Sequence, residues 1–203
     1  MTKVLMYKRF ERFWHWTQAA LVLALAFTGF NIHGTFTVLS YEQASAVHTT
    51  LLWALLGLWA FAIFWHFTTG EWKNYIPTTE KMAEVFRFYT IGIFKGEEHP
   101  YEKTPEKKLN PLQRLAYLGL KLVLNPGLII SGLLYLFYNQ WPETVAQILT
   151  LEIVALVHTA FAFFMVSFVI LHVYLITTGH TVGAHLKAMV TGYEEIDKHT
   201  PAE

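Results

Sequence analysis

Four stretches of the chain contain no Asp, Glu, Lys or Arg, and their hydrophobic residues leave no polar face at helical spacing. These stretches are residues 13–41, 43–70, 122–142 and 153–186. Each supplies the roughly 20 apolar residues with which an α-helix crosses a bilayer, whereas a helix on a soluble core would carry a polar stripe. The pattern predicts an all-α membrane protein with a single domain over residues 1–203. The four transmembrane helices of this bundle are expected at about 13–33, 45–69, 111–138 and 151–178.

The segment between the second and third predicted spans has a helical pattern of its own. Apolar residues follow Pro77 at helical spacing, namely Met82, Val85, Phe86, Tyr89 and Ile93. This spacing predicts an amphipathic helix that lies on the membrane surface. Residues 95–108 are charged and irregular, so we expect them to be solvated.

Local signals mark the third span and the C-terminal tail. Asn110 followed by Pro111 predicts a helix start, because Asn is a favoured N-cap residue and Pro is tolerated at the first helical position. Pro126, within the same span, lacks a backbone N–H and predicts a kink. Residues 182–191 predict a short surface helix that ends at Gly192.

Basic residues are distributed unevenly between the predicted loops. Four precede the first span, eight lie between Lys73 and Arg114, and none occurs in residues 34–47 or 139–151. Cytoplasmic loops carry the excess of Lys and Arg. Both termini and the loop with the amphipathic helix are therefore expected on the cytoplasmic side.

The absence of cysteine narrows the candidate chemistry. Thiolate-bound iron–sulfur clusters, covalently attached c-type haem and disulfides within the chain all require cysteine. A redox cofactor must then be held by histidine or without covalent bonds. The formal net charge is +0, so nucleic acid is not an expected partner.

Histidine is the candidate ligand of this chain. His15, His48, His158 and His172 lie inside the charge-free stretches, where an ionisable side chain is costly and is a functional candidate by default. His158 and His172 are fourteen residues apart, which is about 21 Å of helix and nearly four turns, so both rings face the same side. This spacing suits two stacked haems, each bound by histidines from facing helices.

The expected orientation gives each of these histidines a depth in the membrane. His48 and His158 fall near the outer surface, and His15 and His172 fall near the inner surface. Depth therefore predicts two haem-binding pairs, His48 with His158 and His15 with His172. The alternative for each histidine is a hydrogen bond between helices.

Further histidines and glycines have two interpretations each. His33 and His66 lie near the ends of spans and are interpreted as interface residues or neighbours of haem propionates, with ligation as the alternative. Gly29, Gly57 and Gly132 would let a flat macrocycle approach the backbone, or they simply allow close helix packing.

Several runs of the chain together resemble a known family. They are RFERFWHWTQAALVLALAFTGF, AVHTTLLWALLG, KLNPLQRLAY and the pair VHTAFAFF and LHVYLITTGH. These runs are similar to the bacterial cytochrome b561/nickel-hydrogenase cytochrome b superfamily. Within it, the resemblance is strongest to the cytochrome b subunits of formate dehydrogenase and thiosulfate reductase.

The resemblance implies a dihaem cytochrome b subunit in the bacterial cytoplasmic (inner) membrane. It implies two haem b groups whose iron is bound by the same four histidines, and a quinone (menaquinone or ubiquinone) as substrate. The implied partner is a periplasmic redox subunit, such as a molybdopterin enzyme, a hydrogenase, or a multihaem or iron–sulfur electron carrier. Asn110 and Gln113 of the LNPLQR run are the implied quinone contacts, although capping alone explains Asn110.

Other assignments stay open at the level of sequence. A stand-alone cytochrome b561-type oxidoreductase would need no partner subunit, and a haem-free transporter or membrane anchor would use the histidines for proton or metal relay. The direction of electron flow is also open. Lys121 can reach a haem propionate or the membrane interface, and His180 and His185 can deliver protons or belong to a surface helix.

Overall fold

The chain forms two compact units, each built around a pair of long helices. The computed structural model describes residues 2–97, 99–101, 104, 107–178 and 181–196. Unit 1 comprises Met1–Asn74, Lys103–Lys108 and Gly179–Glu203, and unit 2 comprises Tyr75–Glu102 and Leu109–Thr178. The two units are described separately.

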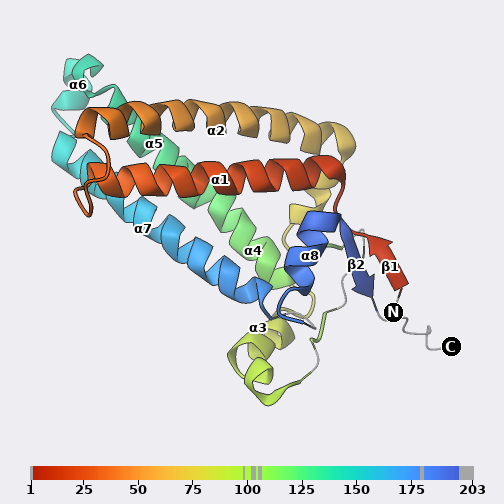
Figure 1. Ribbon diagram of the computed structural model, residues 1–203. Coiled ribbons are helices and arrows are strands. Elements are labelled where there is room, and N and C mark those ends of the chain that lie inside the picture. Colours follow the sequence, from red (N-terminus) through yellow and green to blue (C-terminus); the bar gives the residue numbers. More distant parts are fainter. Residues whose placement is uncertain (1, 98, 102–103, 105–106, 179–180, 197–203) are drawn as a thin grey trace. The chain divides into compact units, whose positions relative to one another are not determined.

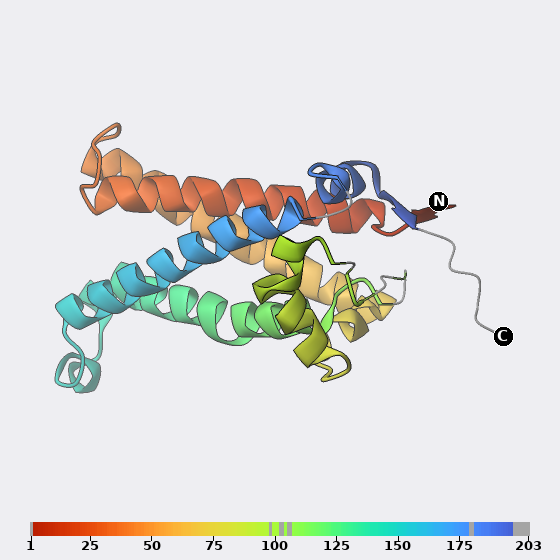
Figure 2. The same ribbon diagram turned by 90° about the horizontal axis from the view of Figure 1, so that it is seen from below.

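The core of unit 1 is the antiparallel pair α1 (Arg9–Ile32) and α2 (Tyr41–Thr69), which run side by side in both views (Figures 1 and 2). Both helices begin four residues before the predicted spans. In α2 the cause is a capping box, because Ser40 Oγ accepts the Gln43 N–H at 3.2 Å and Gln43 Oε1 accepts the Ser40 N–H at 3.1 Å. The Ser-x-x-Gln spacing is a readable signal for this earlier start.

The two ends of the chain meet in unit 1. Strand β1 (Thr2–Leu5) pairs antiparallel with β2 (Tyr193–Ile196), and α8 (Ala184–Thr191) precedes β2. Carbonyls in the last turn of α8 accept hydrogen bonds from side chains of α1, namely Val190 O from Arg12 Nη1 at 2.6 Å and Met189 O from Trp16 Nε1 at 3.2 Å. The tail helix and its end at Gly192 are confirmed, but the all-α prediction is wrong at these strands. Two four-residue strands at opposite ends of a chain leave no local periodicity from which their pairing can be predicted.

A buried ion cluster in unit 1 holds the side chain of Lys108. Lys108 Nζ lies 2.8 Å from Glu11 Oε1 and 3.0 Å from Glu71 Oε2, and Lys108 is only 6% exposed. Glu71 Oε1 also contacts Lys8 Nζ at 2.6 Å. The expectation that residues 95–108 are solvated is therefore wrong at Lys108. A lysine ammonium is buried only when carboxylates pair with it, and its partners here are distant in sequence.

The same cluster shifts the proton affinity of its members. Burial acts to raise the pKa of the Glu71 carboxyl, but hydrogen bonds from Lys8 and Lys108 outweigh it and leave this pKa below its ordinary value. The hydrogen bond to Glu71 raises the pKa of Lys8 above its ordinary value. Both carboxylate and ammonium are thus stabilised in their charged forms.

Unit 2 pairs a three-part helix with one long helix. The first consists of α4 (Pro111–Gly119), the π-helical segment η3 (Leu120–Leu124) and α5 (Asn125–Leu136), and α7 (Leu151–Ile176) packs beside α5 (Figure 1). The predicted start at Pro111 is confirmed. The kink predicted at Pro126 stays a prediction. Just before this proline the structure has one π turn, in which the Asn125 N–H bonds to Leu120 O. A widened turn gives room to a proline that can donate no backbone hydrogen bond.

Short elements complete unit 2. They are α3 (Met82–Thr90), η2 (Gly92–Lys95), η4 (Tyr138–Gln140) and α6 (Glu143–Ala146). The helix predicted after Pro77 is therefore present as α3. Its buried residues are Val85 and Phe88, whereas Phe86 is 58% exposed. The placement of this helix on a membrane surface stays a prediction.

Three helices within the described part of the chain are long and apolar enough to cross a membrane. They are Tyr41–Thr69, Pro111–Leu136 and Leu151–Ile176. Helix α1 is not one of these three, because His15 and Gln18 lie among its apolar residues. A membrane-spanning role for α1, and with it the four-helix bundle, stays a prediction.

Candidate functional site

His48 of α2 is held by a hydroxyl from α1. Its Nδ1 lies 2.9 Å from Thr28 Oγ1, and Thr28 is only 2% exposed. The same hydroxyl lies 2.9 Å from Ala24 O and 3.1 Å from Leu25 O. A hydroxyl has one hydrogen, and the carbonyls of its own helix take it, so the oxygen accepts a hydrogen from Nδ1. This contact favours the imidazole tautomer with hydrogen on Nδ1 and a lone pair on Nε2.

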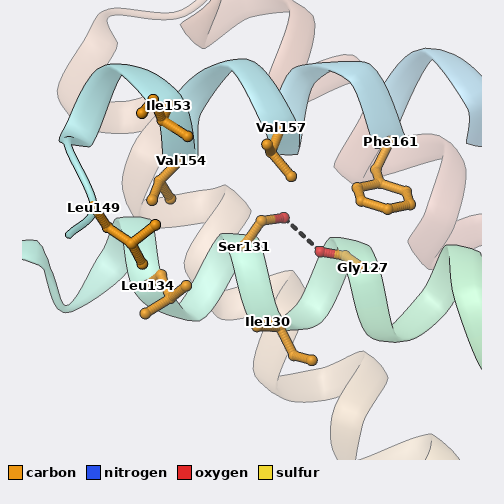
Figure 3. A pocket seen from close by; sticks show the side chains of 9 residues that line it. All are labelled: Gly127, Ile130, Ser131, Leu134, Leu149, Ile153, Val154, Val157 and Phe161. Carbon is orange, nitrogen blue, oxygen red and sulfur yellow. Dashed lines mark hydrogen bonds between the residues drawn. The ribbon is translucent and has the colours of Figure 1, made fainter. Parts of the chain in front are cut away.

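His158 of α7 has the same arrangement in unit 2. Its Nδ1 lies 3.0 Å from Ser131 Oγ on α5, and Ser131 is 4% exposed. Ser131 Oγ donates to Gly127 O at 2.5 Å, the contact drawn in Figure 3. Because that carbonyl takes the hydroxyl hydrogen, Ser131 also favours hydrogen on Nδ1. Neutral imidazole with a lone pair on Nε2 is the form that binds a metal ion.

A glycine follows each of these hydroxyl residues and faces the histidine ring. A Cβ added to Gly29 would lie 3.4 Å from His48 Cε1, and a Cβ added to Gly132 would lie 3.0 Å from His158 Cε1. A side chain at either position would crowd the ring edge. At Gly57 an added Cβ would meet nothing within 4 Å, so close packing does not explain that glycine.

The other two candidate histidines lie among aromatic rings. The His15 ring meets Trp16 edge-on, with 5.2 Å between ring centroids, and the His172 ring stacks on Phe168 at 6.1 Å with 7° between planes. Trp14 Nε1, beside His15, is buried and has no hydrogen-bond acceptor among the described residues. A buried indole N–H of this kind suits a ligand that carries an acceptor such as a carboxylate.

His33 and His66 differ from each other in the structure. His33 is exposed at the end of α1, as expected for an interface residue. His66 is 7% exposed, its Nδ1 lies 2.6 Å from Ala62 O, and its ring meets Trp14 edge-on at 5.1 Å. His66 is therefore buried rather than exposed at an interface, and its role as a neighbour of a haem propionate stays a prediction. It packs under a tryptophan because α1 and α2 are in contact along their length.

An apolar pocket of about 220 Å³ lies between α5 and α7 (Figure 3). Its lining residues are Gly127, Ile130, Ser131, Leu134, Leu149, Ile153, Val154, Val157 and Phe161. Ser131 is the single polar side chain in this lining and also the hydrogen-bond partner of His158. The pocket is suited to an apolar group that approaches the helix pair at the level of the histidine.

Asn110 is fully buried and belongs to a neutral polar cluster in unit 2. Its Oδ1 accepts the Gln113 N–H at 2.8 Å, and Gln113 Oε1 accepts the Asn110 N–H at 3.1 Å. Its Nδ2 donates to Tyr89 Oη at 3.2 Å, and Tyr89 Oη lies 3.3 Å from His99 Nε2. Burial raises the pKa of the Tyr89 phenol, against the opposing effect of the Asn110 hydrogen bond. Capping is thus confirmed for Asn110, and Tyr89 and His99 are additional candidates.

Sequence reasoning missed the functional potential of Tyr89 and His99 for different reasons. Tyr89 was placed on the apolar face of the amphipathic helix, and that position is consistent with its half-buried ring. His99 lies in the segment expected to be solvated, but its ring packs on Phe88 with 4.7 Å between centroids. No local pattern in a charged loop indicates which residue folds back onto a helix.

Two residues with open roles have neighbours within their own units. The Lys121 ammonium lies 3.1 Å from the centroid of the Tyr75 ring, a cation–π contact. His185 Nδ1 lies 3.3 Å from Glu194 Oε1. His180 lies outside the described residues.

The residues present fit a haem. Two of the four candidate imidazoles, His48 and His158, are oriented through Nδ1, Gly29 and Gly132 keep the edges of these rings clear of side chains, and the buried Trp14 N–H suits an acidic substituent. Haem iron takes histidine as an axial ligand, with its other nitrogen hydrogen-bonded. The site is thus compatible with histidine-bound haem.

Comparison with known proteins agrees with this chemistry. The family model described as "Prokaryotic cytochrome b561" matches residues 6–192. A protein of Escherichia coli (strain K12) named "Putative cytochrome YdhU" is 33% identical over 198 residues, which cover 94% of this chain and 74% of that protein. No solved structure matches the chain. The resemblance noted in the sequence is confirmed: this chain belongs to the prokaryotic cytochrome b561 family, which consists of membrane cytochromes that bind haem b.

Proposed function

We propose that this chain is a dihaem cytochrome b that transfers electrons between a periplasmic redox partner and the quinone pool of the bacterial cytoplasmic membrane. The observation that carries the proposal is the repeated arrangement at His48 and His158. Each unit holds a half-buried histidine against a hydroxyl and a glycine of the neighbouring helix, and each favours a lone pair on Nε2. Haem iron, when bound, supplies the one-electron chemistry.

Depth in the membrane is the basis for the proposed ligand pairs. With both termini on the cytoplasmic side, His48 and His158 belong to the outer haem, and His15 and His172 belong to the inner haem. The fourteen-residue spacing on α7 supports one ligand for each haem from that helix. The role of the protein is to orient four imidazoles and to exclude water from the path between the two sites.

Asn110 and Gln113 are proposed to contact quinone near the inner haem. Both amides already form the cap of α4. We therefore propose that the neighbouring Tyr89 phenol, which accepts a hydrogen bond from Asn110 Nδ2, contacts the quinone together with them. Burial keeps that phenol protonated, so it can donate a hydrogen bond at neutral pH. Quinone reduction consumes two protons with two electrons, which gives a role to a buried donor beside a cytoplasmic surface.

A visible difference spectrum tests the haem proposal directly. Purified protein from haem-replete membranes should show the sharp α band of bis-histidine haem b on reduction, with two haems for each chain by pyridine haemochrome assay. One haem for each chain would overturn the dihaem proposal. No α band would favour the haem-free transporter or anchor.

Substitution at Asn110 tests the quinone proposal. Asn110→Asp should slow electron exchange with a soluble quinol analogue while both haems remain, because a carboxylate replaces the amide that donates to Tyr89. The matched control is Asn139→Asp, since Asn139 is an exposed asparagine of η4 (Tyr138–Gln140). Unchanged quinol kinetics in Asn110→Asp would reject the contact.

The proposed partner is tested by electron transfer in membranes. Deletion of the gene for an adjacent periplasmic redox enzyme should abolish substrate-dependent reduction or oxidation of the haems, while dithionite still reduces them. Undiminished turnover would favour the stand-alone oxidoreductase. The direction of the substrate-dependent change would also identify the direction of electron flow.

A further inference from the structure

We propose that Thr28 and Ser131 are positioning residues that hold His48 and His158 in the Nδ1–H tautomer and lower the midpoint potential of the haem that these two histidines would bind. The inference rests on the proposed pairing of His48 with His158. It goes beyond that pairing because it assigns an electronic role to two hydroxyl groups that touch neither iron nor substrate. The two contacts occur in different units, and in both a hydroxyl residue followed by glycine meets the histidine ring.

The direction of the hydrogen bond carries the electronic effect. Thr28 Oγ1 and Ser131 Oγ donate to carbonyls of their own helices, so each accepts from the imidazole Nδ1 at 2.9 Å or 3.0 Å. An acceptor at Nδ1–H makes the imidazole a stronger base toward the metal. Stronger donation stabilises the ferric state relative to the ferrous state and therefore lowers the potential.

The hydroxyl groups also restrict ring rotation. A histidine ring can turn about its Cβ–Cγ bond unless a contact holds it, and here Nδ1 is fixed by a hydroxyl while Cε1 faces the following glycine. The hydroxyl residues are themselves rigid, because each is nearly fully buried and is bonded back to its own helix. The ring plane of each histidine is thus determined before any cofactor is bound.

The chain offers matched control residues for this role. Thr50 on α2 bonds to Ala46 O at 2.9 Å, and Ser167 on α7 bonds to Phe163 O at 2.9 Å. Each makes the same contact to its own helix as Thr28 or Ser131, and each is exposed and lies on the same helix as a ligand histidine. Removing the hydroxyl of Thr50 or Ser167 deletes a hydrogen bond to a carbonyl of the same helix, as at Thr28 or Ser131, but it removes no partner of a histidine.

The test is a redox titration of each haem in the full-length protein, followed by visible absorbance. Thr28→Val and Ser131→Ala should each raise the midpoint potential of the same haem. The expected change is about tenfold in the relative affinity of ferric and ferrous iron, which is 59 mV for a one-electron couple. Thr28→Ser and Ser131→Thr keep the hydroxyl and should restore the original potential, whereas Thr50→Val and Ser167→Ala should leave both potentials unchanged.

The outcomes separate this inference from the proposed function. A wild-type protein with fewer than two haems contradicts the proposed function itself. With two haems retained, unchanged potentials in Thr28→Val and Ser131→Ala overturn the positioning role. If Thr28→Val shifts the midpoint potential of one haem and Ser131→Ala shifts that of the other, the two residues do not act on the same haem, and the proposal is overturned. If Ser131→Ala does not accumulate in membranes, Ser131→Cys, whose thiol is a weak acceptor, is titrated in its place with the same expected direction.

Discussion

The α1–α2 pair and the α5–α7 pair hold a histidine in the same way but are joined by different contacts. In α1–α2, the Trp59 indole donates to Gln18 Oε1 at 2.7 Å across the pair. In α5–α7, the Phe161 ring lies directly against Gly127, where an added Cβ would overlap it. The shared part is the hydroxyl–histidine contact, and the helix contacts around it vary.

The two helix pairs also differ in how closely the glycine backbone approaches the histidine ring. The Cβ distance at the histidine ring is 3.4 Å for Gly29 and 3.0 Å for Gly132, so the second pair is packed more tightly at its histidine. A polar contact between side chains tolerates a wider spacing of helices, whereas a ring over a glycine requires backbones to come near. The same ligand geometry is therefore reached with more steric freedom in unit 1 than in unit 2.

The largest expected effect tests whether the two histidines are equivalent. His48→Ala and His158→Ala should each remove one haem and leave about half of the haem content, because a bis-histidine site loses a ligand. Haem is measured for each chain by pyridine haemochrome assay. Loss of one haem in His66→Ala, with His48→Ala harmless, would contradict the proposed pairing.

The second prediction concerns the tight contact in unit 2. Gly127→Ala should lower the thermal unfolding temperature, because overpacking costs about 1–3 kcal/mol and the Cβ meets the Phe161 ring. Gly119→Ala, in α4 of the same unit, is the control, since an added Cβ there meets nothing within 4 Å. An equal melting temperature for both variants would show that the α5–α7 contact is looser than described.

The third prediction uses the two glycines that face histidine rings. Gly132→Ala should weaken haem retention more than Gly29→Ala, because its Cβ comes 0.4 Å closer to the ring carbon, at 3.0 Å rather than 3.4 Å. Haem loss to apomyoglobin measures retention in each variant. A larger loss in Gly29→Ala would reverse the order of packing between the two pairs.

The smallest expected effect is a pH dependence of the melting temperature that comes from Glu71 in the ion cluster of unit 1. The polar cluster around Asn110 in unit 2 contains no carboxylate among the described residues. The pKa of Glu71 is lower in the folded protein than its ordinary value of 4.5. Its stabilising contribution is therefore complete above that value and is lost as pH falls through the folded pKa. The melting temperature of wild type should exceed that of Glu71→Gln at pH 7, and the two should converge below pH 4.5. A constant difference across this range would exclude Glu71 as the titrating group.

Local signals in the sequence predicted a large part of the fold. Asn110 and Pro111 predicted the start of α4, and Gly192 predicted the end of α8. Each of these residues affects the backbone hydrogen bonds or dihedral angles of the one or two helical turns next to it. The ion partners of Lys108 lie far from it in sequence, so its burial was not predictable in this way.

The sequence by itself determined that hydrophobic helices carry histidines at defined positions, because length, charge and helical spacing are properties of contiguous residues. Only the tertiary structure decided which hydroxyl meets each histidine. Thr28 and His48 are brought together by the packing of α1 on α2, and Ser131 and His158 by the packing of α5 on α7. Side-chain contacts between helices depend on how the helices are rotated and how closely they approach, and neither quantity is encoded in a local pattern.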